Sequence, residues 1–425
     1  MKSRSNARHQ RGVAALLVTT LLCFAMLLVV AYANRNIVVE VRSAANQLRA
    51  AQAREAAEAG LEWALARLDD DSRVGPDCRP SNDAAALSSR QRWLRFIDAA
   101  GRIAPVTWND AGTPTPLRAA CVLTAAGWTC SCPASGVPSL PASTGDMAAP
   151  AFTVEFTASA TPGIVGIVAT GCVNGSGVCA VRSDAPHEAS SRLQASFALL
   201  PALRSAPAAA LTVRGEFDAG TAALGVHNRD TGSTGLAIHA GGTITASGLR
   251  MTVPPGSSLA DSLVGRDASL ASLDAGAFFA RFFGMTIDAW SAQPAVTRLT
   301  CHGDCTSTVV AAVAAGHRLL YVDGDFALTG PAAFGTVDEP VAIVARGDVR
   351  LSGAVAVVGL VHAASLRWDD AASPGALLRG AAVVAGSYGG NGAADIARDD
   401  AVLAHLKTRR GSFVRVNGSW KDFRS

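Results

Sequence analysis

The sequence has few aromatic residues and no concentration of charge of one sign. Aromatic side chains make up 6% of the 425 residues and charged side chains 17%. The net charge of +3 is spread over mixed acidic and basic residues, so there is no basic stripe of the kind that nucleic-acid binding requires. Because the chain is 49% hydrophobic and holds 41 glycines, small side chains must dominate the surface it builds.

Catalytic and metal-binding motifs are also missing. The sequence contains no His-Glu-x-x-His pair, no Gly-x-Ser-x-Gly elbow and no Gly-x-x-x-x-Gly-Lys phosphate loop. Asp323 and Asp325 could offer oxygen atoms to calcium, but no glutamate follows at EF-hand spacing, which favours a turn. We therefore expect no enzyme activity, no cofactor and no metal site.

Proline is missing from the first part of the chain, and glycine nearly so. Residues 13–71 contain one glycine, Gly60, and no proline. Residues 13–33 are uncharged and match the roughly 20 residues that a helix needs to cross a membrane. Beyond them, apolar residues recur mainly at three- and four-residue steps as far as Leu68. This pattern predicts one continuous helix.

The charges before the apolar run predict its orientation. Lys2, Arg4, Arg8 and Arg11 precede it without any acidic residue, which places the N-terminus in the cytoplasm and the bulk of the chain outside. The run is too long for the core of an ordinary secretory signal, so cleavage on its far side is not expected.

The N-terminal region resembles that of PilX-type minor pilins of the type IV pilus. The resemblance rests on residues 10–17, the uncharged span and the Ala- and Glu-rich residues 51–64, and covers about residues 8 to 68. In that family a prepilin peptidase removes a basic leader after a glycine on the cytoplasmic face, and the new N-terminal residue is usually methylated. The resemblance implies cleavage between Gly12 and Val13.

Leu17 is a departure from the major pilins, which carry a glutamate as the fifth residue of the mature chain. That carboxylate is thought to pair in the lipid with the N-terminal amine of a neighbouring subunit. PilX-like minor pilins and the K-type minor pseudopilin of type II secretion share its absence, so the resemblance implies a tip or priming subunit. In a plain membrane anchor, Leu17 would simply face lipid.

Two functional hypotheses follow. The first is a minor pilin in the initiation or tip complex of the pilus, anchored in the bacterial inner membrane with its bulk periplasmic and carried to the pilus tip on assembly. Its implied partners are inner membrane lipid, the prepilin peptidase, other minor pilins and the major pilin, and its C-terminal part could display an adhesive surface for an unidentified ligand. The second is a membrane-anchored periplasmic β-helical protein that binds or cleaves carbohydrate. Within the first class, a K-type pseudopilin remains an alternative.

Eight of the nine cysteines follow the membrane span, and an even number in an oxidising compartment predicts disulfides. Cys172 and Cys179 bracket a turn-rich loop and are predicted to pair. Cys301 and Cys305 enclose three residues, where a disulfide is favoured over a metal site because no second Cys/His pair is near. The other four allow three connectivities: Cys78, Cys121, Cys130 and Cys132.

The predicted fold class is α+β: a long N-terminal transmembrane helix with an antiparallel pilin-like sheet, then a mainly β, Gly-rich module. The leader is 1–12, the membrane half of the helix 13–33, the extramembrane helix and head 34–200, and the module 208–425. In the head we expect a short helix over 90–99 and strands over 119–124, 127–131, 152–158, 164–170 and 191–200.

The module carries imperfect glycine-bounded apolar repeats at 241–248, 324–330 and 347–353. The last two start 23 residues apart, close to one coil of a parallel β-helix, and an antiparallel sandwich is the alternative. A Phe-rich amphipathic helix over 269–289 is predicted to cover the sheet. A helix over 396–408 and a strand pair over 413–420, turning at Asn417-Gly418, complete the prediction.

Overall fold

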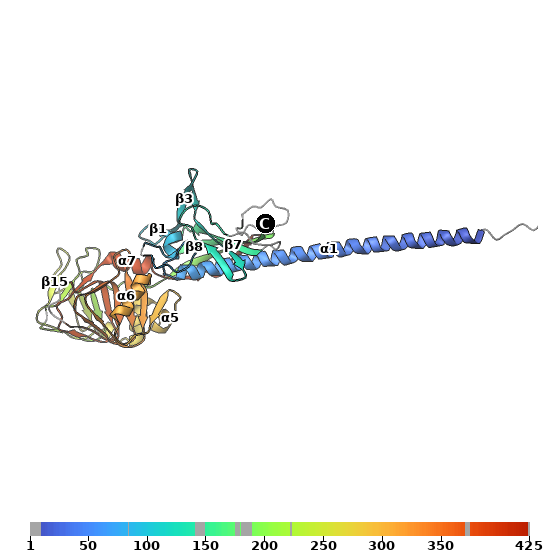
Figure 1. Ribbon diagram of the computed structural model, residues 1–425. Helices are drawn as coiled ribbons and strands as arrows, with labels where there is room; N and C mark the ends of the chain where they lie inside the picture. Colours follow the sequence, from blue (N-terminus) through green and yellow to red (C-terminus); the bar gives the residue numbers. More distant parts are fainter. Residues whose placement is uncertain are drawn as a thin grey trace, which may run out of the picture.

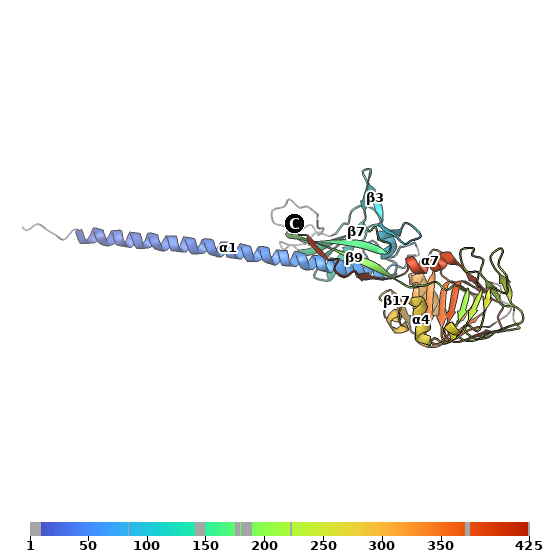
Figure 2. The same cartoon turned by 180° about the vertical axis from the view of Figure 1, so that it is seen from behind.

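The computed structural model describes residues 10–83, 85–140, 149–174, 179, 189–221, 223–369 and 375–423. One long helix, α1, projects from a small β-rich head, and a larger β-solenoid lies at the opposite end of the head (Figure 1). The reverse view in Figure 2 shows the same order of rod, head and solenoid. The chain is therefore an α+β protein, as expected.

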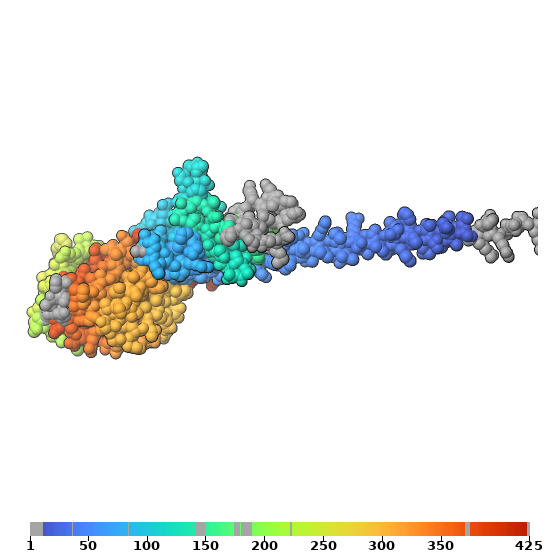
Figure 3. All heavy atoms as spheres, viewed as in Figure 1, coloured from blue at the N-terminus to red at the C-terminus, as the bar shows by residue number. Residues whose placement is uncertain are grey.

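Helix α1 (Gln10–Asp69) is 60 residues long and unbroken. At 1.5 Å per residue it is about 90 Å long. In the apolar part of α1, threonine hydroxyls form hydrogen bonds within the helix: the Thr19 hydroxyl donates to the Ala15 carbonyl at 3.0 Å. All described side chains of residues 12–44 are exposed, and the space-filling view shows this part standing free of the rest (Figure 3).

The head is an antiparallel sheet that packs on the second half of α1. Its strand order is β29-β9-β8-β7-β5-β6, and β30 also pairs with β9. The strands have these bounds: β5 (Arg118–Thr124), β6 (Gly127–Ser131), β7 (Ala149–Ala158), β8 (Ile164–Asn174), β9 (Ala189–Pro201), β29 (Gly411–Arg415) and β30 (Lys421–Phe423). Ala57, Leu61 and Ala64 of α1 are buried in one core with Phe152 and Phe156 of the sheet.

Smaller elements precede the head sheet in the chain, and of these the β3–β4 hairpin projects outward from the head (Figure 1). They are α2 (Ser89–Trp93), β1 (Leu94–Phe96), β2 (Ile103–Pro105), β3 (Thr107–Asp110) and β4 (Thr113–Pro116). The prediction of a helix over 90–99 is wrong beyond Trp93. A capping box between Ser88 and Gln91 starts α2, but the next three residues pair with β2 and extend the chain.

The C-terminus returns to the head. The predicted strand pair over 413–420 is wrong, because β29 and β30 do not pair with each other but follow one another along the same edge of β9. Phe413 is buried in the head core. The stretch 208–425 is thus not one module, since its last residues complete the head sheet.

The solenoid has three parallel faces. The first is β17-β19-β22-β24-β26-β10-β13-β16, the second β18-β20-β23-β25-β27-β11-β14, and the third β21-β24-β26-β28-β12-β15, with β24 and β26 bending to serve two faces. All these pairings are parallel, so the sandwich alternative is wrong. The repeats at 241–248, 324–330 and 347–353 supply β14, β20 and β23 of the second face, and β20 pairs β23 at an offset of 23 residues (Phe326 with Val349).

These are the strand bounds: β10 (Leu211–Val213), β11 (Phe217–Gly220), β12 (Gly225–His227), β13 (Ile238–Ala240), β14 (Ile244–Ala246), β15 (Arg250–Thr252), β16 (Leu263–Val264), β17 (Val296–Leu299), β18 (Gly303–Asp304), β19 (Leu319–Val322), β20 (Phe326–Thr329), β21 (Ala332–Phe334), β22 (Val341–Ala345), β23 (Val349–Ser352), β24 (Val355–Ala363), β25 (Leu366–Asp369), β26 (Leu377–Val384), β27 (Tyr388–Gly390) and β28 (Asp395–Arg398). Inward-facing apolar side chains stack between coils, and the rings of Phe217 and Tyr388 lie 5.1 Å apart across two of them.

The coils are not stacked in the order of the chain. The chain enters the solenoid in the middle of the stack, where β10 lies between β26 and β13. It winds outward to β16, crosses back to the end nearest the head, and winds inward from β17 to β28. The last coil then pairs with the first, through β28 and β12.

Helices make the return crossing and cover the solenoid. They are α3 (Ala268–Ala271), α4 (Ala275–Phe283) and α5 (Ile287–Ser291), so the prediction of one helix over 269–289 is wrong in its continuity. Asp267, Asp274 and Thr286 each accept an N-terminal backbone N–H and start a new helix. The Phe-rich face of α4 is buried against the first solenoid face, as predicted.

Two more helices close the solenoid. Helix α6 (Thr306–Ala315) covers the end nearest the head and buries Val309 in the solenoid core. Helix α7 (Asp400–Thr408) follows β28, so the predicted helix over 396–408 begins later than expected. Residues 395–398 are in the sheet because they pair with β26.

Gly171 of β8 is the closest approach of the sheet to α1. A Cβ atom there would lie 2.0 Å from the Ala53 carbonyl oxygen and 2.4 Å from the Ala57 nitrogen. We predict that Gly171→Ala lowers the free energy of unfolding by at least about 2 kcal/mol, because α1 must move away from the sheet. Chemical denaturation of the detergent-solubilised chain measures this. Gly389→Ala is the control, since nothing lies within 4 Å of its Cβ position, and equal losses in both variants would contradict the prediction.

Candidate functional site

The predicted leader junction lies inside α1 and is sterically open. Gly12 has nothing within 4 Å of the position that a Cβ would take, and Val13 and Leu17 are 68% and 56% exposed. Lys2, Arg4 and Arg8 lie outside the described residues. In the part of the chain that is described, α1 is the one helix that is long and apolar enough to cross a membrane, so it could serve as an anchor.

The structure joins the eight cysteines that follow the span into four disulfides. Cys172 is bonded to Cys179 and Cys301 to Cys305, the two pairs predicted from spacing. Among the pairings that were left open, it contains Cys78–Cys132 and Cys121–Cys130. The first ties the loop after α1 to the end of β6, and the second links β5 to β6. Cys23 in the exposed part of α1 is free.

Several outward-facing ionic residues of the solenoid form ion pairs. Arg346 bonds to Asp323 at 3.0 Å and also to Asp288, and Arg367 bonds to Asp369 at 2.6 Å. Asp325 accepts the backbone N–H of residue 348 at 2.7 Å, which fits a turn. The described residues contain no group of three His, Cys, Asp or Glu that could hold a metal ion.

The most unusual chemistry lies where α1 ends, at the junction of the head and the solenoid. Asp69, Asp70 and Asp71 follow one another at the C-terminus of α1, where the helix dipole disfavours negative charge. Asp69 and Asp71 are nonetheless 5% and 3% exposed. Buried carboxylates at this end of a helix require cationic partners.

Arg90 of α2 is the central partner. Its guanidinium donates to the Leu68 carbonyl at the end of α1 at 2.6 and 2.9 Å, and to the Gly411 carbonyl of β29 at 2.9 Å. It also lies 4.0 Å from a carboxylate oxygen of both Asp69 and Asp71. Asp69 in turn accepts the backbone N–H of Phe413 at 2.6 Å. One side chain therefore holds the helix end, the C-terminal strand and two acids together.

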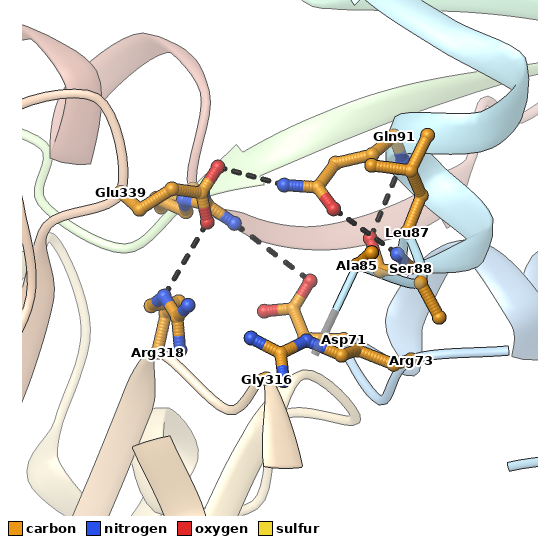
Figure 4. Close-up of a pocket in the computed structure, with 11 residues that line it drawn as sticks. Asp71, Arg73, Ala85, Leu87, Ser88, Gln91, Gly316, Arg318 and Glu339 are labelled. Carbon is orange, nitrogen blue, oxygen red and sulfur yellow. Dashed lines mark hydrogen bonds and ion pairs between the residues drawn. The ribbon is translucent and has the colours of Figure 1, made fainter. Parts of the chain in front are cut away.

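Glu339 extends this network into the solenoid. It follows β21, and Figure 4 shows it facing Arg318 and Gln91 across the junction. Its carboxylate accepts from Gln91 at 2.9 Å, lies 3.3 Å from Arg318 and bonds to Arg410. Gln91 belongs to the head. Glu339 and Arg318 belong to the solenoid, and Arg410 to the segment that leaves it, so these contacts join the head to the solenoid.

The junction shifts the pKa values of its acids in opposite directions. Burial raises the pKa of the Asp69 carboxyl to about 6, although the N–H of Phe413 and the charge of Arg90 oppose the shift. Burial alone would raise the pKa of Glu339, but Arg410 and Arg318 outweigh it and hold that pKa below its usual value. Burial lowers the pKa of Arg90. The Asp69 carboxyl therefore holds its proton to a higher pH than an exposed aspartate does.

A small cavity opens within the network. It has a volume of about 190 Å³, and Asp71, Arg73, Arg318 and Glu339 are among the residues that line it (Figure 4). Neither carboxylate oxygen of Asp71 has a hydrogen-bond partner among the described residues, and the nearest cationic nitrogens lie 3.9 and 4.0 Å away. At that spacing an ordered water can bridge the groups.

This junction was not predicted from the sequence. A signal was present, because three consecutive aspartates at the end of a strongly predicted helix oppose its dipole, and cations are favoured at that position. The arginines that lie beside these aspartates, Arg90 and Arg410, are about 20 and 340 residues further along the chain. No local pattern links them to α1.

These parts define a protein with one candidate membrane helix that carries an antiparallel head and a parallel β-solenoid. No protein-family model matches the chain, and no curated protein matches it. Among solved structures it is similar to the competence-associated pilin ComZ from Thermus thermophilus, with 13% identity over 88% of this chain and 97% of that chain. The TM-score of 0.20 is too low for this likeness to support an assignment of fold or function.

We predict that Arg90→Leu destabilises the protein by about 3 kcal/mol or more. The substitution leaves Asp69 buried without its cation, removes one of the two cations beside Asp71, and removes the donors to Leu68 and Gly411. Chemical denaturation followed by tryptophan fluorescence measures the loss. Arg102→Gln, which breaks an exposed ion pair with Asp98, should cost less than about 1 kcal/mol. A similar small cost for Arg90→Leu would show that the cluster contributes little.

The raised pKa of Asp69 predicts a pH dependence of stability. A carboxyl with a folded-state pKa near 6 and an ordinary unfolded-state value binds its proton more tightly when folded. Its unfavourable contribution is therefore full above pH 6 and is relieved as the pH falls towards 4. Relative to Asp69→Asn, the wild-type protein should gain about 1–2 kcal/mol between pH 8 and pH 5. Unfolding curves of both proteins across this range test the prediction, and parallel pH profiles would contradict it.

Proposed function

We propose that this protein is a minor pilin of the type IV pilus, acting in the initiation or tip complex. The observation that carries the proposal is the division of α1. From Ala53 onward α1 packs beneath an antiparallel sheet, and its first half exposes apolar side chains along its whole length. Such a half-helix is stable in lipid before assembly and among the helices of other subunits afterwards.

The proposal includes the processing that the sequence resemblance implies. A prepilin peptidase would cut between Gly12 and Val13 on the cytoplasmic face of the inner membrane, and the new terminus would be methylated. The exposure of Gly12 and Val13 supports access to this bond. The head and solenoid would lie in the periplasm until assembly, with other minor pilins and the major pilin as partners.

Two features of the protein favour a position at the tip of the pilus. Leu17 provides no carboxylate for the terminal amine of a neighbouring subunit, so this subunit is tolerated best where it needs no such pair. The solenoid also lies at the far end of the molecule from the membrane helix, where a subunit stacked above would meet it (Figure 1). We propose that the solenoid is displayed outward there as an adhesive surface whose ligand is unidentified. A K-type pseudopilin of type II secretion would use the same geometry and stays the alternative within this class.

We propose a structural role and no catalysis. Two of the clusters of acidic and basic side chains on the outside of the solenoid are held in ion pairs, Arg346 with Asp323 and Asp288, and Arg367 with Asp369. These pairs stabilise the outer surface of the coils and leave the ionic groups without the free geometry of an acid–base pair.

The test is the N-terminus of the mature protein. Co-expressed with a prepilin peptidase, the chain should begin at Val13, and Gly12→Val should retain the leader because the implied cleavage follows a glycine. Ala15→Val, an equal enlargement three residues further on, should still be processed. Intact-mass spectrometry with N-terminal sequencing identifies the first residue of the wild-type protein and of both variants. A wild-type chain that keeps Met1, or that is cut after Ala33, would contradict the proposal.

A further inference from the structure

Asn417 and Gly418 form the tip of the turn that joins the two C-terminal strands of the head, β29 and β30. Both residues are exposed, and Gly418 has a φ of 74° with nothing within 4 Å of the position that a Cβ would take. The backbone N–H of Gly418 makes no hydrogen bond to the described part of the chain. The side-chain amide of Asn417 is therefore next to a backbone nitrogen that is both unhindered and free of hydrogen bonds to described residues.

This pair of residues can close a succinimide ring on itself. The Gly418 nitrogen attacks Cγ of Asn417, and the side-chain nitrogen leaves as ammonia, taking up the proton that the attacking nitrogen loses. Water then opens the ring at one of its two carbonyls and yields aspartate or isoaspartate. Because the reacting atoms belong to neighbouring residues, the step needs backbone freedom and access of water, and glycine favours it since no Cβ shields its nitrogen.

A second Asn-Gly pair, Asn391 and Gly392, has a different environment. Gly392 is buried, and its N–H donates to the Trp368 carbonyl at 2.9 Å. A Cβ at Gly392 would lie 3.0 Å from that same carbonyl oxygen, so the backbone here is closely packed. The nitrogen of this pair is held by its hydrogen bond, although the two pairs have the same sequence. A third pair, at 174–175, extends beyond the described residues.

The turn is attached to β9 at both of its ends through one residue, Ser196. The Ser196 carbonyl accepts the N–H of Val416 at 2.9 Å, and the Ser196 N–H donates to the Ser419 hydroxyl at 3.0 Å. Isoaspartate carries the main chain through its side chain and so adds one carbon atom to the backbone between these two attachments. We expect one of the two bonds to break in that form. Aspartate adds no backbone atom and can keep both.

The residues that follow the turn contact α1. A carboxylate oxygen of Asp422 in β30 lies 3.9 Å from the Arg54 guanidinium, and the Trp420 ring centroid lies 5.6 Å from the same group. Loss of an attachment at Ser196 would therefore loosen the C-terminal strand from both β9 and α1.

We propose that Asn417 is a site of spontaneous covalent modification: the folded protein converts it to aspartate and isoaspartate while protecting Asn391, and the isoaspartate form releases the turn from β9. The proposal goes beyond the pilin assignment and does not depend on it. The only co-reactant is water.

The test is ageing of the detergent-solubilised full-length chain at mildly alkaline pH, where the attacking nitrogen loses its proton more readily. Peptide mapping by mass spectrometry should show a carboxylate in place of the amide at 417 at least about 10-fold sooner than at 391, the factor expected from one hydrogen bond that must open first. In guanidinium chloride, where neither site is held, the two rates should be equal. Fragmentation of the peptides distinguishes isoaspartate from aspartate.

Matched variants identify the site and its effect. Asn417→Gln keeps an amide but would need a larger ring, so it should remove the product, whereas Asn391→Gln should leave the product at 417 unchanged. Hydrogen exchange at the Ser196 amide should become faster in the isoaspartate form, because its acceptor on Ser419 is lost. Asn417→Asp, which has the new charge without the extra backbone atom, should exchange as the wild-type protein does.

Two results would overturn the assignment of the site: no conversion at 417 in the folded protein, or conversion at 391 at the same rate. Unchanged exchange at Ser196 in the isoaspartate form would overturn the release of the turn. Faster exchange in Asn417→Asp as well would assign the effect to the charge and also contradict the proposal.

Discussion

The continuity of α1 is the constraint on which the rest of the molecule depends. A helix of about 90 Å cannot fold back on itself, so its two halves must find different environments. Alanines and Gly60 on one face of the second half allow the head sheet to approach closely, and Gly171 brings β8 almost onto the helix backbone. The first half has no such cover among the described residues, and its apolar side chains are exposed.

The charged junction solves a problem that this helix creates. α1 ends in three aspartates at the position where its dipole disfavours them, and two of the three are buried by the head and the solenoid. Arg90 compensates for the helix end and the acids at once, and Glu339 with Arg318 and Arg410 carries the network across to the solenoid. A buried network of this kind contributes more to the definition of one arrangement than to net stability, because desolvation offsets most of the attraction.

The permuted order of the coils gives the solenoid a double attachment. The chain enters after β9 and leaves towards β29, two neighbouring strands of the head sheet. The two crossing segments are bonded to each other, since the backbone N–H of Ala202 donates to the Arg410 carbonyl at 2.8 Å. A force on the solenoid would therefore reach the head through two strands and α1 beneath them, which is consistent with the proposed display of the solenoid at the pilus tip.

The sequence by itself determined the elements whose causes are local. The absence of proline fixed one helix from the membrane span to Leu68, the 23-residue glycine spacing predicted parallel coils, and close cysteine spacing predicted two disulfides. Tertiary structure decided the elements whose hydrogen-bond partners lie far away in the sequence. Residues 94–96 and 395–398 became strands because strands elsewhere offered them hydrogen bonds, and caps at Asp274 and Thr286 divided one amphipathic stretch into separate helices. The stacking order and the Arg90 network were out of reach of the sequence, because parallel pairing and buried charge join residues hundreds of positions apart, with no periodicity to connect them.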